Sequence, residues 1–260
     1  MLRHMSWAVK WPPMQVLPLL LGHRGTRVSP SFPENTLQGF DAALDQGCNG
    51  FEFDVRATAD RELVIVHDPK CGRLTVARAS RSDLPELPSL KEVLRKYGRR
   101  AFLDIELKVQ WMEPAVLELL RAHTPVCGYV VSSFLAAVIL ELRVRRSALQ
   151  LGIICDKPAQ LRRAWDLPVD YMILEQSLVR RDVVQEVQAA RRKLLVWTVN
   201  RPESMLRLAD WGADGIISDN PALLAHTLSR ERAETPKPQA KKIIRAAVKA
   251  GKRQGRKSGD

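Results

Sequence analysis

Short apolar segments and longer amphipathic segments alternate along the chain from residue 17 to about residue 229. The apolar segments are rich in Val, Ile and Leu and show little polar alternation, which is typical of strands buried on both faces. They predict eight strands, over residues 16–22, 48–58, 100–109, 128–134, 149–156, 169–175, 193–200 and 212–220.

The amphipathic segments between them have the 3.6-residue period of helices. They predict helices over residues 34–47, 89–98, 113–123, 135–147, 158–166, 183–192, 203–212 and 221–229. Gly47, Gly98 and Gly212 stand where helices should end, and Pro202 and Pro221 suit first helical turns. Eight strand–helix repeats predict one (β/α)8 barrel of the α/β class. An open doubly wound sheet is the alternative, but no Gly-x-Gly-x-x-Gly motif follows the first strand.

Length and composition agree with a single large domain. The chain has 260 residues, of which 45% are hydrophobic, and such barrels commonly run to about 250 residues. No stretch of about 18 apolar residues is present, so we expect no membrane-spanning helix. The first residues contain only the short apolar run VLPLLL and no small-residue cleavage site, so we expect no secretory signal. We therefore expect an extension over residues 1–16, the barrel over 17–229 and a tail over 230–260.

The four cysteines, Cys48, Cys71, Cys127 and Cys155, are scattered and form no Cys-x-x-Cys pair. This spacing predicts small buried apolar side chains rather than a disulfide framework or a zinc site. It also indicates a reducing compartment, so we expect a cytoplasmic protein.

The positive charge is concentrated at the C-terminus. Residues 230–260 hold eleven Lys/Arg and three Asp/Glu, a net charge of +8, which leaves only +4 of the total +12 for the rest of the chain. Few large apolar residues occur there, so we expect a solvated, disordered tail, with a short helix near Ile243–Ala250. Such a tail could contact an anionic membrane or a nucleic acid, or have no partner.

Acidic residues gather at the predicted carboxyl ends of strands, where barrels of this kind have their active sites. Glu52 and Asp54 are two positions apart on one strand, so their side chains point to the same side. Glu106 comes from the next barrel strand. Three converging carboxylates without a thiolate suit a hard divalent cation such as Mg²⁺ or Ca²⁺. The alternative is simple pairing of these carboxylates with arginine or backbone groups.

Histidine and basic residues lie at the same strand ends. His23 and His67 are two of five histidines, and facing a metal site they could act as general base and general acid. A lone histidine is more often a residue of the core. Arg24 and Lys108 either pair with the carboxylates or hold an anionic, phosphate-like substrate. Asn200 and Asp219 end the last two strands and receive no role from the sequence.

Three stretches of this sequence resemble one known family. The segment from LGHRG through PENTLQGFDAALDQGCNGFEFDVRATADRELVIVHD resembles the N-terminal signature of glycerophosphodiester phosphodiesterases, in the phosphatidylinositol-phospholipase-C-like phosphodiesterase superfamily. DIELK resembles its third-strand motif, and VWTVN with WGADGIISDNP resembles its closing motif. The resemblance covers residues 20 to 225, approximately. It implies metal-dependent hydrolysis of a glycerophosphodiester to glycerol 3-phosphate and an alcohol, a reaction of glycerol and lipid metabolism.

The resemblance also implies roles for individual residues. It implies metal ligands at Glu52, Asp54 and Glu106, an acid–base pair at His23 and His67, phosphate contacts at Arg24 and Lys108, and an aromatic lining the glycerol side of the pocket at Trp197. The alternative for Trp197 is a place in the barrel core. Which histidine is the acid, and whether water or a substrate hydroxyl attacks phosphorus, stay open.

One departure from the family bears on the substrate. The insertion that usually follows the His-Asp motif is short here, because only residues 69–87 separate Asp68 from Pro88. A lysophospholipase D acting on lipids is therefore an alternative on the same fold. An alternative of another class is a protein that binds nucleic acid or an anionic surface through its basic tail, although a scaffold needs no converging Glu, Asp and His residues.

Overall fold

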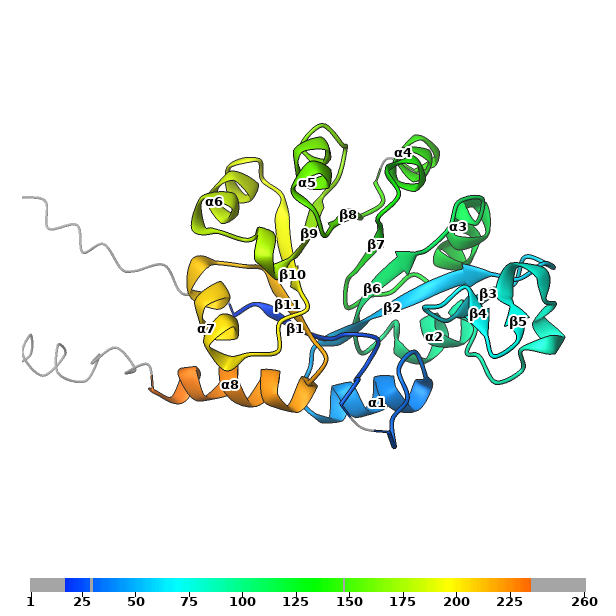
Figure 1. The fold of residues 1–260 in the computed structure, drawn as a ribbon, viewed down its shortest axis with the longest axis horizontal. Helices are drawn as coiled ribbons and strands as arrows, with labels where there is room; N and C mark the ends of the chain where they lie inside the picture. The colour runs from blue at the N-terminus through cyan, green and yellow to red at the C-terminus, as the bar shows by residue number, and fades with distance from the viewer. Residues whose placement is uncertain (1–16, 29, 147, 235–260) are drawn as a thin grey trace, which may run out of the picture.

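The computed structural model describes residues 17–28, 30–146 and 148–234, and its centre is a closed barrel of parallel strands (Figure 1). The barrel strands are β1 (Leu19–Gly22), β2 (Gly50–Ala57), β6 (Phe102–Leu107), β7 (Tyr129–Ser133), β8 (Leu151–Cys155), β9 (Tyr171–Glu175), β10 (Lys193–Trp197) and β11 (Gly215–Ser218). Each pairs with the next, and β1 pairs with both β11 and β2, which closes the barrel. The predicted strands and barrel are confirmed.

Helices cover the outside of the strands (Figure 1). They are α1 (Leu37–Asp45), α2 (Leu90–Tyr97), α3 (Glu113–Ala122), α4 (Ala136–Arg145), α5 (Pro158–Ala164), α6 (Arg181–Ala189), α7 (Pro202–Trp211) and α8 (Pro221–Glu234). A short 3-10 helix, η3 (Gln176–Leu178), follows β9. Each predicted helix is present, and α8 continues beyond residue 229. Residues 243–250, where the sequence predicts a short helix, lie outside the described residues.

The helix ends follow the signals in the sequence. Pro202 and Pro221 are the first residues of α7 and α8, as expected. Gly47 and Gly212 follow α1 and α7 with left-handed φ angles of +100° and +90°, which glycine adopts without a Cβ penalty. Gly98 also follows its helix, but its φ of −58° is right-handed, so that end does not depend on glycine's freedom.

The segment after β2 forms a small side structure. Strand β3 (Leu63–Ile65) runs antiparallel to the end of β2, which is the hairpin-like continuation expected from the sequence. Beyond it lie β4 (Lys70–Cys71) paired with β5 (Leu74–Thr75), and two 3-10 helices, η1 (Val76–Arg78) and η2 (Arg81–Asp83). Val76, Ala79 and Leu84 bury themselves against Val64 of β3. In Figure 1 this segment lies at one edge of the molecule, beside α2.

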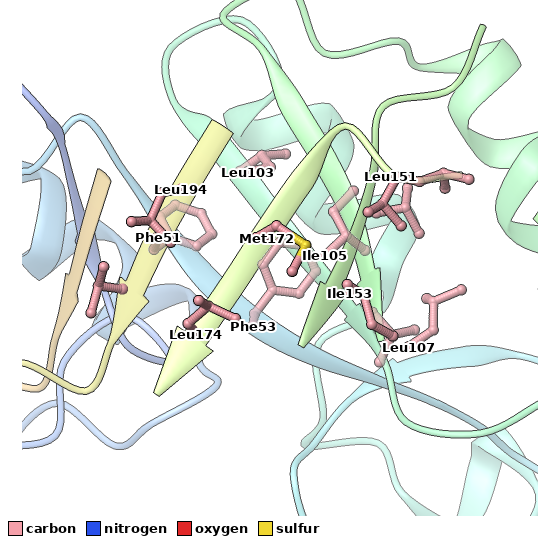
Figure 2. Close-up of a cluster of buried hydrophobic side chains, with 14 of the residues drawn as sticks. Phe51, Phe53, Leu103, Ile105, Leu107, Leu151, Ile153, Met172, Leu174 and Leu194 are labelled. Carbon is pink, nitrogen blue, oxygen red and sulfur yellow. The ribbon is translucent and has the colours of Figure 1, made fainter. Parts of the chain in front are cut away.

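The two faces of the barrel strands are buried in two different apolar clusters. The larger fills the layer between strands and helices and includes Phe51, Phe53, Ile105 and Met172 (Figure 2). Each such large buried side chain contributes about 1.5–3 kcal/mol through its transfer from water. Because successive side chains of a strand point to opposite faces, burying Phe51 and Phe53 outside the barrel turns Glu52 and Asp54 to its interior.

The cysteines are only partly as expected. Cys48 and Cys155 are buried and free, but Cys71 is half-buried and Cys127 is exposed. The prediction of a buried apolar role is therefore wrong for Cys127, which lies in the turn before β7 rather than in a strand. No helix in the described ranges is long and apolar enough to cross a membrane.

Candidate functional site

The three acidic residues singled out in the sequence meet at the carboxyl ends of neighbouring strands. Glu52 and Asp54 lie on β2, Glu106 lies on β6, and the register of the two strands pairs Asp54 with Glu106. One carboxylate oxygen from each lies within 4.8 Å of the others, and all three side chains are buried.

Two cations lie against these carboxylates. Lys108 Nζ is 2.7 Å from Glu106 Oε1 and 3.2 Å from Asp54 Oδ1. Arg24 Nε is 3.2 Å from Asp54 Oδ2, and the Arg24 backbone N–H donates to Glu52 Oε2 at 3.0 Å. The other end of the Arg24 guanidinium donates to Glu34. The pairing of carboxylates with basic residues, given above as the alternative explanation, is therefore present. These ion pairs surround one pocket.

Asn35 is a member of the site that the sequence did not reveal. Its side-chain amide donates to Asp54 Oδ2 at 2.7 Å, and its carbonyl oxygen accepts from the Asp54 backbone N–H at 3.2 Å. Asn35 is buried with a left-handed φ of +58° just before α1, a conformation that asparagine tolerates better than most residues. Its only signal was its place in the PENT stretch that carried part of the resemblance.

Burial and neighbouring charges give the three carboxylates different pKa values. Burial, added to the charges of Asp54 and Glu106, raises the pKa of Glu52 well above its ordinary value. Burial likewise raises the pKa of Glu106 to about 7, although Lys108 opposes the shift. For Asp54 burial also disfavours the charge, but Lys108 and Arg24 outweigh it and lower the pKa. Asp54 is therefore the carboxylate most firmly held in its ionised form.

The donor set fits a metal ion. Glu52 Oε1 is buried without a hydrogen-bond partner, and leaving a carboxylate oxygen desolvated and unpaired is costly. All three side chains offer oxygen, the donor that hard divalent cations prefer. Glu52, Asp54 and Glu106 could therefore hold a metal ion.

His23, directly after β1, is oriented by a residue from the last strand. Its Nδ1 lies 2.7 Å from Asp219 Oδ1, and its Nε2 lies 3.8 Å from Glu52 Oε2. The side-chain amide of Asn200 donates to Asp219 Oδ2 at 2.7 Å, and Arg27 approaches Asp219 Oδ1 at 3.3 Å. Burial would raise the pKa of Asp219, but its bonds to His23 and Asn200 lower it to about 2.

His67 is held differently. Its Nδ1 lies 2.7 Å from Oδ1 of its neighbour Asp68. Arg56 of β2 donates from Nε to the backbone carbonyl of His67 at 2.8 Å, which ties the loop after β3 to the barrel. The His67 side chain is 35% exposed, whereas that of His23 is 10% exposed. The two histidines thus face the site from different depths.

A pocket of about 100 Å³ opens between these groups. Its lining residues are His23, Arg24, Glu52, His67, Asp104, Glu106, Lys108, Phe134, Ile154, Ile173, Trp197 and Ile217. Trp197 donates from Nε1 to the carbonyl of Ile173 at 3.4 Å and meets Phe134 edge-on, with ring centroids 5.7 Å apart. Trp197 therefore lines the pocket and also packs against the apolar interior of the barrel.

Asp104 is a further acidic residue of the pocket that the sequence did not single out. It is fully buried, accepts from Ser132 Oγ at 2.6 Å and keeps its other oxygen unpaired. Burial raises its pKa to about 7, although the Ser132 bond opposes the shift. The signal was available, because Asp104 and Glu106 are two apart on β6, as Glu52 and Asp54 are on β2.

The arrangement places two histidines, two basic side chains and a potential metal site around one space. Histidines can take up and release protons near neutral pH. Arg24 and Lys108 can stabilise negative charge in a pocket shielded from water. The pocket therefore has the groups needed to cleave a bound anionic ester.

Comparison with known proteins points the same way. The model of the glycerophosphoryl diester phosphodiesterase family matches residues 23–124 and 112–223, a range that contains every residue lining the pocket. A glycerophosphodiester phosphodiesterase from Caldanaerobacter subterraneus is 26% identical over 242 residues, covering 82% of this chain and 98% of its own.

Solved structures are similar over the same extent. The glycerophosphodiester phosphodiesterase from Thermotoga maritima superposes with a TM-score of 0.68 at 26% identity, over 80% of this chain and 97% of its own. A phosphodiesterase from Oleispira antarctica, solved with the product sn-glycerol-3-phosphate, gives a TM-score of 0.72 at 25% identity, over 82% and 97% of the two chains.

Proposed function

Because the chain belongs to the glycerophosphoryl diester phosphodiesterase family, we propose that it hydrolyses glycerophosphodiesters to glycerol 3-phosphate and an alcohol, as part of glycerol and lipid metabolism. The observation that carries the proposal is the convergence of Glu52, Asp54 and Glu106 beside Arg24 and Lys108 in one pocket. The neighbour solved with sn-glycerol-3-phosphate supports the identity of the product.

Glu52, Asp54 and Glu106 are the proposed ligands of a divalent cation, Mg²⁺ or Ca²⁺. When bound, such a cation supplies neutralising charge to the phosphate and makes the attacking oxygen more acidic. Arg24 and Lys108 hold the phosphate and stabilise the charge that builds up on its oxygens. Trp197 lines the opposite side, against the glycerol.

His23 is the proposed general base. Its Nδ1 is engaged by Asp219, so Nε2 is left to accept a proton from the attacking hydroxyl, which belongs to water or to the substrate. The negative charge of Asp219 stabilises the imidazolium that results. His67, nearer the solvent, then protonates the departing alkoxide.

The decisive experiment measures choline release from glycerophosphocholine with and without excess chelator. Turnover should disappear with chelator and return when Mg²⁺ or Ca²⁺ is added. Glu52→Gln should weaken cation binding, measured by calorimetry, together with turnover, because it removes one charged ligand. The matched control is Glu62→Gln, at an exposed position between β2 and β3. It should change neither cation binding nor turnover. Full turnover in excess chelator would contradict the proposal.

The charged tail has a separate proposed role. The proposed catalytic unit is the barrel over residues 17–229, and residues 1–16 and 230–260 lie outside it, although α8 itself continues to Glu234. Residues 230–260 carry a net charge of +8, and we propose that they contact anionic membranes or nucleic acid by salt-sensitive attraction. The four free cysteines support a cytoplasmic location.

A further inference from the structure

His67 lies on a part of the chain that the barrel strands do not fix directly. It follows β3, a three-residue strand at the end of the strand order, which runs antiparallel to the end of β2. The partner of its ring, Asp68, belongs to the same loop and is 73% exposed. That bond can therefore orient the ring within the loop, but it cannot hold the loop against the barrel.

Arg56 supplies a bond between this loop and the barrel. It lies on β2 two positions after Asp54, so the two side chains point to the same side of the strand. Arg56 Nε donates to the backbone carbonyl of His67 at 2.8 Å. The backbone N–H of Val66 donates to the carbonyl of Asp54 at 2.9 Å. Two bonds to β2 thus hold residues 66 and 67, one from the backbone and one from the Arg56 side chain.

The guanidinium of Arg56 is suited to holding this carbonyl. A hydrogen bond from a charged donor is stronger than one from a neutral donor, and the planar guanidinium loses little freedom for each bond that it forms. Burial lowers the pKa of Arg56, and the charges of three nearby carboxylates oppose the shift. Because arginine stays protonated in proteins, the bond to His67 keeps its charged donor at neutral pH.

The position of Arg56 favours an effect on His67 rather than on the substrate. His67 lines the pocket, whereas Arg56 is not among the lining residues. The bond from Arg56 ends on the backbone of His67, so it fixes the residue in place and leaves the ring nitrogens to Asp68 and the substrate. The position of a catalytic group matters, because a displacement of about 1 Å can lower a rate by about 10²-fold.

Building on the phosphodiesterase function proposed above, we propose that Arg56 is a positioning residue for departure of the alcohol. It holds His67 where the imidazolium reaches the leaving oxygen. As the bond between phosphorus and that oxygen breaks, the electron pair stays on the oxygen, and the proton of His67 completes the hydroxyl of the alcohol. Loss of Arg56 therefore weakens protonation of the leaving group and leaves attack on phosphorus intact.

The test compares two leaving groups on the same glycerol phosphate. Turnover by the full chain is measured on glycerophosphocholine, whose choline alkoxide needs a proton to depart, and on the p-nitrophenyl ester of glycerol 3-phosphate, whose p-nitrophenolate departs as a stable anion. Arg56→Ala should lower kcat about 10²-fold on the choline ester and leave kcat on the nitrophenyl ester nearly unchanged. KM should stay near the wild-type value for both, because Arg56 does not line the pocket.

Two further variants separate the bond from its charge and from general effects of losing an arginine. Arg56→Lys keeps the charge and one donor but lacks the planar fork, so it should lose less turnover of glycerophosphocholine than Arg56→Ala does. Arg73→Ala is the matched control, because Arg73 is an exposed arginine between β4 and β5, in the segment after His67. It should change turnover of neither substrate.

A double-mutant cycle tests whether Arg56 acts through His67. In a chain that already carries His67→Ala, Arg56→Ala should lower turnover of glycerophosphocholine little further, because residues that act as one unit have non-additive effects. Independent losses that multiply in the double variant would show that Arg56 acts elsewhere, and would overturn the proposal.

The outcomes separate this proposal from the function on which it rests. Equal losses on both substrates for Arg56→Ala, or no loss on either, overturn the positioning role, while turnover by the wild type leaves the phosphodiesterase function standing. Absence of glycerophosphocholine turnover by the wild type overturns the phosphodiesterase function itself.

Discussion

At the scale of single residues, each histidine of the site has an aspartate at its Nδ1 atom, but the two aspartates differ. Asp219 is held by Asn200 and Arg27 and is mostly shielded, whereas the side chain of Asp68 is 73% exposed. A shielded carboxylate stabilises a neighbouring imidazolium more than an exposed one does, because water screens it less. This difference supports His23 rather than His67 as the base.

Both histidines should be required for turnover. His23→Ala and His67→Ala are each expected to lower kcat by about 10²-fold or more, the usual contribution of a general acid or base. The pH–rate profile of the wild type should be bell-shaped, and each variant should lose one limb. A variant with near-normal kcat would assign that histidine a structural role only.

Asp219 should make stability depend on pH in a defined window. Its folded-state pKa of about 2 lies below the ordinary value of 3.8, so its stabilising effect is present above about pH 4 and is lost as the pH falls toward 2. Wild type should therefore exceed Asp219→Asn in free energy of unfolding at pH 5, and the difference should shrink by pH 2. Denaturant unfolding at both pH values measures this, and a constant difference would argue against the ion pair.

The residues of the site divide into those that sequence can reveal and those that it cannot. Glu52 and Glu106 are visible because acidic side chains inside apolar strands break the local pattern. Asp219 is visible as a strand-end residue, but its pairing with His23 spans 196 positions along the chain and depends on closure of the barrel. Asn35 lies in a loop, where its bond to Asp54 is set by tertiary structure.

At the scale of elements, strand alternation and helix-end signals carry most of the fold. The eight barrel strands follow from apolar runs, and the helices from their period. The segment 69–87 could not be predicted, because β4, β5, η1 and η2 are two- or three-residue elements with no period to read. Its shape depends on burial of Val76 and Leu84 against β3.

The glycine that ends α7 should be necessary for stability. A Cβ at Gly212 would lie 2.8 Å from Gln188 Nε2, which donates to the Gly212 carbonyl, and φ is +90°. Gly212→Ala should therefore lower the free energy of unfolding by about 1–2 kcal/mol. Gly72→Ala is the matched control, because φ there is +57° with open space around the Cβ. An equal loss in both variants would show that only the backbone angle matters.

At the scale of the whole molecule, charge is divided unequally between the barrel and the tail. Residues 230–260 carry +8 of the total +12. Because the barrel contains every residue that lines the pocket, catalysis on a soluble substrate should not need the tail.

Truncation after Glu234 tests this while keeping α8 whole. Turnover of glycerophosphocholine should be unchanged, and retention on anionic vesicles or on RNA should fall, with both attractions weakened by salt. Loss of turnover would make the tail part of the enzyme. Unchanged retention on both surfaces would show that it binds neither.

Closure of the barrel by β1 and β11 also bears on when the candidate site can form during synthesis of the chain. His23 emerges from the ribosome early, whereas Asp219 is among the last residues of the barrel, 196 positions later. Until β11 is available, a nascent chain can contain Glu52, Asp54 and Glu106 while His23 has no aspartate to orient it. Contacts between residues far apart in sequence slow folding, and during synthesis the C-terminal partner of such a contact becomes available last. We therefore expect fragments that end before β11 to lack the proposed hydrolase activity.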